Sequence, residues 1–147
     1  MFDRHFTFFA DELPKWAEDK LKVSDQREEK LLSGFSNSAG FVVTLIRQRP
    51  MQYGGVIANS VAGGHPPKDE KIEAFKSLPE NAPRPKFSFS SGTWEKYFGL
   101  NTGNWDRYVR KHGADSKRIK VVGGHDQAIW EINIAQALPW MLPPHGK

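Results

Sequence analysis

Apolar residues recur at helical spacing between residues 93 and 113, in the stretch TWEKYFGLNTGNWDRYVRKHG. Trp94 and Phe98 lie at positions i and i+4, so they share one face of a first short helix. Gly99 suits the left-handed backbone conformation that commonly ends a helix. A second helix is predicted over about 102–112, because apolar or aromatic side chains recur there at helical spacing, namely Trp105, Tyr108, Val109 and His112.

The N-terminal part of the chain predicts two helices and a β-hairpin. Helices are expected over about 12–22 and 25–34, the second with a start that resembles a capping box. The run GFVVTLIR at 40–47 is β-branched and largely apolar, which is typical of a strand. A second strand over about 53–60 would pair with it.

The C-terminal part predicts a longer series of elements after a glycine- and proline-rich loop. In chain order these are a helix at 69–78, a strand at 86–90, the two helices described above, a strand at 119–122, a tight turn at 123–126 and a strand at 128–134.

This order resembles a winged helix-turn-helix DNA-binding domain. Gly99, Leu100 and Asn101 match the turn of that motif, and the segment from Asn104 onward matches its second helix. The fold class expected from this resemblance is α+β, with an N-terminal helix pair and β-hairpin followed by a winged-helix-like domain. The expected boundaries are 1–62 for a possible dimerisation or sensing unit, 69–134 for the nucleic-acid-binding domain and 135–147 for a proline-rich tail.

The positive charge of the chain is concentrated in the same region. The net charge is +4 overall. Residues 104–120 carry six Lys and Arg against two Asp, a balance of +4, whereas residues 1–30 carry six against eight, a balance of −2. A cationic surface attracts polyanions, although a solvated helix face is the alternative interpretation.

The resemblance implies that the helix at 102–112 enters the major groove of double-stranded DNA and that the wing contacts the neighbouring DNA backbone or the minor groove. Asn and Arg side chains suit base edges, and Lys suits phosphates. The residues implied for nucleic-acid binding are Asn101, Thr102, Asn104, Arg107, Arg110, Lys111, Lys117, Arg118, Lys120 and His125. A role in transcription or in plasmid or phage regulation follows, with a possible homodimer and no cofactor.

Two alternatives stay open. His65 and His125 each follow a Gly-Gly pair, and together they could act as general acid and base in a small metal-independent ribonuclease. The other interpretation of Gly-Gly-His is a turn with an exposed histidine. A winged helix can also serve as a protein–protein adaptor.

Several classes of site are not expected. The chain has no cysteine, which excludes disulfides and thiolate metal sites. We find no metal-ligand spacing, no phosphate-binding glycine loop, no dinucleotide fingerprint and no nucleophile elbow. No apolar run has the length of a membrane span, so we expect a cytoplasmic protein.

Overall fold

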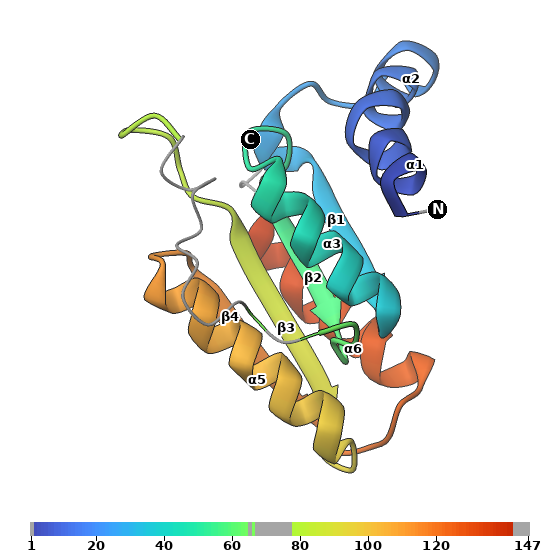
Figure 1. Cartoon of the computed structure of the whole chain (residues 1–147), viewed down its shortest axis with the longest axis vertical. Coiled ribbons are helices and arrows are strands. Elements are labelled where there is room, and N and C mark those ends of the chain that lie inside the picture. Colours follow the sequence, from blue (N-terminus) through green and yellow to red (C-terminus); the bar gives the residue numbers. More distant parts are fainter. Residues whose placement is uncertain (1, 65, 67–77, 143–147) are drawn as a thin grey trace.

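The centre of the molecule is a parallel β-sheet with the strand order β1-β2-β3-β4 (Figure 1). The computed structural model describes residues 2–64, 66 and 78–142. Because all the pairings are parallel, the four strands end at the same edge of the sheet, and crossover connections join them. The strands are Leu31–Phe35 (β1), Gly55–Asn59 (β2), Lys86–Gly92 (β3) and Ser116–Val121 (β4).

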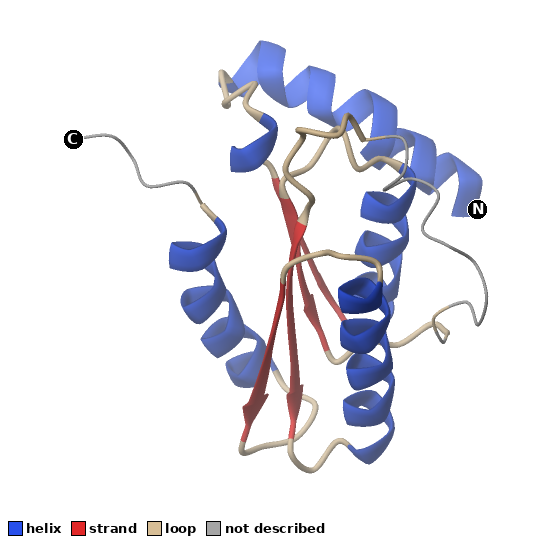
Figure 2. Ribbon diagram, turned by 90° about the vertical axis from the view of Figure 1, so that its left-hand side faces the viewer, coloured by secondary structure: helices blue, strands red, loops and turns tan. Residues whose placement is uncertain are grey.

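Helices cover both faces of the sheet. Figure 2 shows α6 on one face and α3 and α5 on the other. The N-terminal helices lie beside the β1 side of the sheet (Figure 1). The helices are α1 (Phe2–Thr7), the π-helical η1 (Phe8–Glu12), α2 (Leu13–Leu21), the short 3-10 helix η2 (Arg27–Glu29), α3 (Asn37–Gln48), α5 (Lys96–Lys111) and α6 (Gln127–Met141).

The sequence KFSFSSG of β3 shows how the two faces differ. Phe87 and Phe89 are buried in the core cluster that includes residues of α3 and α5, and their rings stack at 5.9 Å between centroids. Ser88 points the opposite way and donates a hydrogen bond to Asn133 of α6. Alternation along a strand therefore places an apolar core under α3 and α5 and polar contacts under α6.

The predicted β-hairpin of the N-terminal part is wrong. The run at 40–47 belongs to α3, because Val42, Val43, Leu45 and Ile46 are all buried at the spacing of one helical face. The predicted second helix at 25–34 is largely replaced by η2 and β1. Only the helix at 12–22 and the strand at 53–60 are confirmed, as α2 and β2.

The predicted helix-turn-helix is also wrong. Residues 96–111 form the single helix α5, and Gly99 lies inside it instead of ending it. The region 128–134 is part of α6, whose first turn is capped when Ile129 N donates to Asp126 Oδ1 at 3.3 Å. The strands at 86–90 and 119–122 are confirmed as β3 and β4. The helix predicted at 69–78 falls almost entirely outside the described residues.

The α+β class with a winged-helix-like domain is therefore contradicted, and the fold is α/β with a parallel sheet. Strands from both sides of the expected boundary at 62–69 join one sheet. The boundaries 1–62, 69–134 and 135–147 themselves stay a prediction, and α6 extends into the expected tail as far as Met141. In the part of the chain described, no helix is long and apolar enough to cross a membrane.

Replacing Phe89 by alanine is expected to lower the free energy of unfolding by about 3–5 kcal/mol, because the side chain is fully buried and the truncation leaves a cavity. The control Trp94→Ala truncates an aromatic side chain that is 75% exposed and should cost less than about 1 kcal/mol. Urea unfolding measures both values. Equal losses would contradict the packing of Phe89 in the core.

Candidate active site

A strained turn carries Ser36 at the carboxyl end of β1. Its backbone angles are φ 54° and ψ −119°, a region that residues with a side chain rarely adopt. The Ser36 N–H donates to the carbonyl of Asn59 at 2.9 Å, which ties this turn to the end of the neighbouring strand β2. The residue after Ser36 begins α3, so the side chain stands at a sharp strand-to-helix turn.

Close backbone contacts near Ser36 leave no room for a side chain at two positions, Gly34 and Gly40. A Cβ on Gly34 would lie 2.5 Å from the carbonyl oxygen of Ser38, and one on Gly40 would lie 2.3 Å from that of Ala62. Glycine is needed at both places because backbone passes too close for a side chain. Ser38 closes the turn from within, since its Oγ accepts from Phe35 N at 2.9 Å and donates to Phe35 O at 2.8 Å.

The backbone of this turn resembles a nucleophile elbow, although the sequence lacks the full motif. The usual pattern is G-x-S-x-G, in which the serine stands on a tight strand-to-helix turn. Here the pattern reads Gly34, Phe35, Ser36, Asn37 and Ser38. The second glycine is replaced by a serine, which hid the motif. The signal that could have revealed the motif is Gly34 two residues before Ser36, between an apolar run and a helical pattern.

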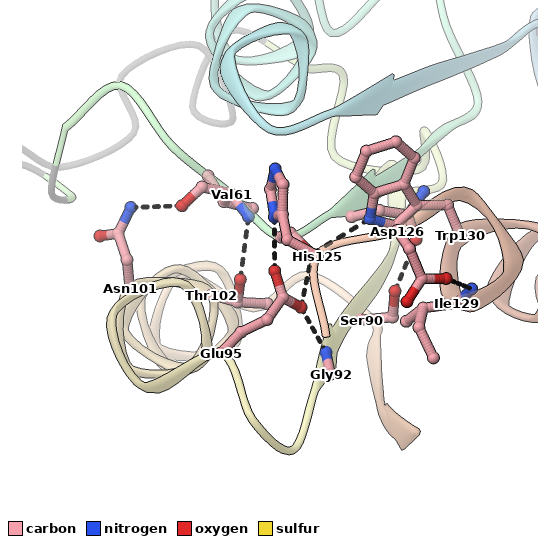
Figure 3. Close-up of polar contacts among 12 residues, drawn as sticks. Val61, Ser90, Gly92, Glu95, Asn101, Thr102, His125, Asp126, Ile129 and Trp130 are labelled. Atoms are coloured by element: carbon pink, nitrogen blue, oxygen red, sulfur yellow. Dashed lines mark hydrogen bonds and ion pairs between the residues drawn. The ribbon is translucent and has the colours of Figure 1, made fainter. Parts of the chain in front are cut away.

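Two further groups meet at the same edge of the sheet. Nδ1 of His125, which follows β4, lies 2.5 Å from Oε1 of Glu95, which follows β3 (Figure 3). The Glu95 side chain is only 3% exposed, whereas that of His125 is 35% exposed. Figure 3 shows the second ring nitrogen of His125 pointing away from the carboxylate. The histidine is thus held at one nitrogen and open at the other.

The Glu95 carboxylate is fixed by more than the histidine. Its Oε2 accepts from the backbone N–H of Gly92 at 2.5 Å and from Oγ of Ser60 at 2.8 Å. Ser60 in turn accepts from Nε1 of Trp130 at 3.1 Å. These hydrogen bonds hold the carboxylate in one orientation.

Aromatic rings connect His125 to the Ser36 turn. Trp130 stacks on Phe35 at 4.8 Å between centroids and meets the His125 ring edge to face at 5.2 Å. Phe98 stacks on the other side of His125 at 4.3 Å. The ring of Trp130 therefore contacts both the imidazole of His125 and the ring of Phe35, the residue directly before Ser36.

The histidine predicted by sequence is therefore found in a constellation that the sequence analysis did not anticipate. His125 was expected to contact phosphate or, in the alternative, to act with His65. His65 lies outside the described residues. Glu95 was not named as a site residue, and nothing in its local sequence marks a buried carboxylate.

Two of the residues predicted to bind nucleic acid are completely buried. Asn101 Nδ2 donates to the carbonyls of Val61 and Gly64, and Thr102 Oγ1 accepts from Val61 N at 3.0 Å. Both side chains are 0% exposed (Figure 3 draws their contacts to Val61). They hold α5 against the loop after β2, and no external ligand reaches them here.

The other predicted residues are spread over different surroundings. Arg107 donates to Asn104, Arg110 pairs with Asp106 at 2.9 Å, and the Lys117 ammonium lies 4.5 Å from the centre of the Trp140 ring. Lys111 is exposed, and Arg118 and Lys120 line a groove beside α5. No observation tests their contact with nucleic acid. Among the described side chains, no three of His, Asp or Glu gather in a way that could hold a metal ion.

The fold is similar to that of solved esterases and hydrolases. A ferulic acid esterase matches with a TM-score of 0.69 and 20% identity, over 92% of this chain and 59% of that chain. The S-formylglutathione hydrolase from Staphylococcus aureus matches with a TM-score of 0.71 and 14% identity, over 97% and 62%. The enterobactin esterase from Shigella flexneri matches with a TM-score of 0.70 and 18% identity, over 89% and 36%.

The chain spans less than two thirds of the length of each of these proteins. No protein-family model and no curated protein matches its sequence. At such identities the likeness concerns the fold alone.

The prediction of a DNA-binding winged-helix regulator is overturned by these similarities. These similar structures are described as esterases or hydrolases, not as DNA-binding domains. Double-stranded DNA as partner, and the role in transcription or in plasmid or phage regulation, are corrected with it. The comparisons do not support the ribonuclease or the adaptor either.

The strain at Ser36 gives a test of the turn. Ser36→Gly and Ser36→Ala both remove the hydroxyl, but only glycine adopts φ 54° and ψ −119° without strain. We expect the glycine variant to exceed the alanine variant by about 1 kcal/mol in free energy of unfolding, despite the greater unfolded-state entropy of glycine. Denaturant unfolding of the two variants in parallel gives the difference. An alanine variant of equal or greater stability would mean that the turn is unstrained.

Proposed function

We propose that this chain carries the hydrolytic site of a serine hydrolase that cleaves carboxylic esters. The observation that carries the proposal is the strained Ser36 turn at the same sheet edge as the Glu95–His125 pair. A nucleophile, a base and an acid that orients the base are the three parts of a serine-hydrolase triad, and they recur on unrelated folds. The similarity to solved esterases supports this function.

In the first half of the reaction, Oγ of Ser36 attacks the carbonyl carbon of the ester. His125 takes the hydroxyl proton on its free ring nitrogen, and the other nitrogen donates its N–H to Glu95. The resulting tetrahedral intermediate collapses, the bond to the leaving alcohol breaks, and His125 returns the proton to that oxygen. Ser36 is then acylated.

In the second half, water takes the place of the alcohol. His125 removes a proton from the water as its oxygen attacks the acyl carbon, and the proton passes to Ser36 Oγ when the ester bond to the enzyme breaks. The products are a carboxylic acid and the regenerated serine. Glu95 keeps its charge throughout and stabilises the imidazolium that forms in each half.

The backbone N–H of Asn37 is a candidate donor for the oxyanion. In nucleophile elbows the amide of the residue after the serine faces the developing negative charge. Asn37 is the first residue of α3, so its N–H has no carbonyl partner within the helix. The positive end of the helix adds to the stabilisation of an anion there.

The aromatic side chains around His125 favour an ester with an apolar part. Phe98 and Trp130 flank the imidazole, and both side chains are partly exposed. Trp94 and Val122 nearby in sequence are largely exposed. Aromatic surfaces of this kind bury apolar ligand groups while a few polar groups orient the reacting bond.

Labelling with a fluorophosphonate and hydrolysis of p-nitrophenyl butyrate test the proposal together. The reagent should modify one serine per chain, identified by mass spectrometry as Ser36, and Ser36→Ala or His125→Ala should abolish labelling and hydrolysis. Ser33→Ala, which removes an exposed hydroxyl from β1, serves as the matched control and should leave both unchanged. Modification of a serine other than Ser36, or no modification of the folded chain, would overturn the proposal.

Glu95→Gln should keep the shape of the acid and remove its charge. We expect kcat to fall by roughly 10³- to 10⁴-fold with little change in KM, because the histidine loses the partner that fixes its tautomer. The ester assay across pH measures this loss, and circular dichroism checks that the fold is retained. A folded Glu95→Gln variant with unchanged kcat would remove Glu95 from the mechanism.

A further inference from the structure

A cationic groove lies beside α5 and shares one lining residue, Glu95, with the proposed ester site. Its volume is about 400 Å³. Lys96 and Arg107 of α5 line one side, and Arg118 and Lys120 of β4 line the other. A groove of this size suits a small organic ligand.

The charge of the groove is not balanced within the described part of the chain. Its four cationic side chains face one acidic residue, Glu95, whose oxygens are already bonded to Gly92, Ser60 and His125. None of the four cations forms an ion pair with a described Asp or Glu. Arg107 donates to the neutral Asn104 instead, and Arg118 donates to the carbonyl of Gly99. Clustered cations without counter-charges attract a multivalent anion.

Two glycines of α5 line the groove, and the one at 103 makes room for the side chain of Arg118. Gly99 and Gly103 are one helical turn apart, and both line the groove or its base. A Cβ on Gly103 would lie 2.5 Å from Nη1 of Arg118, so the guanidinium rests directly on the helix backbone. The arginine is therefore held in place before any ligand binds, which lowers the entropy lost on binding.

We propose that this groove binds a small phosphate-bearing ligand. Four cations against one carboxylate match a di- or trianion better than a single carboxylate group, and the planar guanidinium groups of Arg107 and Arg118 suit phosphate oxygens. Three residues of the basic cluster at 104–120, namely Arg107, Arg118 and Lys120, would contact this ligand. This proposal does not rest on the proposed ester hydrolysis.

Isothermal titration of the full chain with inorganic pyrophosphate at low ionic strength tests the site. Saturable binding to one site per chain is expected, and Arg107→Gln and Lys120→Gln should each weaken it by roughly tenfold or more, since each removes a charge-assisted contact. Lys111→Gln is the matched control, because it removes the same charge from an exposed position of α5 outside the groove. This control should change the affinity by less than about twofold.

The outcomes separate cleanly. No saturable binding to the wild-type chain would overturn the proposal, as would equal weakening by Lys111→Gln, which would mean a general attraction to positive charge. Thermal unfolding of each variant checks that the fold survives. The same titration on Ser36→Ala should give the wild-type affinity, so a failed ester assay and a failed binding assay can be told apart.

Discussion

Two consecutive residues at the end of β2, Asn59 and Ser60, hold the site together. The carbonyl of Asn59 accepts from Ser36 N, and its side-chain Oδ1 accepts from Ser90 and Asn133 at 2.6 Å each. Ser60 bonds through its N–H to the carbonyl of Ser90 and through its hydroxyl to Glu95. These two residues are thus hydrogen-bonded to the turn after β1, to strand β3, to Glu95 and to helix α6.

This arrangement contains strained backbone and, within the described part of the chain, an unpaired buried polar atom. Ser36 and Ser60 both have positive φ although neither is glycine. The buried Nδ2 of Asn59 has no hydrogen-bond partner among the described residues. Strained backbone of this kind costs about 1–3 kcal/mol per residue, and it persists only where the surroundings impose it. Rigid positioning of polar groups, rather than maximal stability, is what the network achieves.

Some of this could be predicted from the sequence and some could not. The sequence predicts β2 and β3 correctly, because each is a short apolar or alternating run bounded by turn residues. The run at 40–47 was misjudged because β-branched residues favour strands, while Val42, Val43, Leu45 and Ile46 also satisfy a helical face. Periodicity alone cannot distinguish a strand from a helix in so short a segment. Burial of one face in the folded protein decides between them.

The site was harder to predict than the strands, for a physical reason. Its residues are separated by up to about ninety positions and converge only because parallel strands end at one edge. His125 was named from its glycine pair, yet its partner was not. Glu95 has no feature in its local sequence that marks it, and only the structure identifies it as a buried carboxylate bonded to His125. Ser36 was missed because Ser38 stands in for a glycine.

The parallel order of the strands also governs when the site can exist. The connections run over residues 36–54, 60–85 and 93–115, so every pairing in the sheet joins distant parts of the chain. Such topologies form slowly, since the entropy of closing each connection is lost before the contacts are gained. His125 follows the last strand, β4. A chain emerging from the ribosome therefore cannot form the Glu95–His125 pair until β4 and His125 have been synthesised, and a folding intermediate that lacks β4 cannot contain this pair.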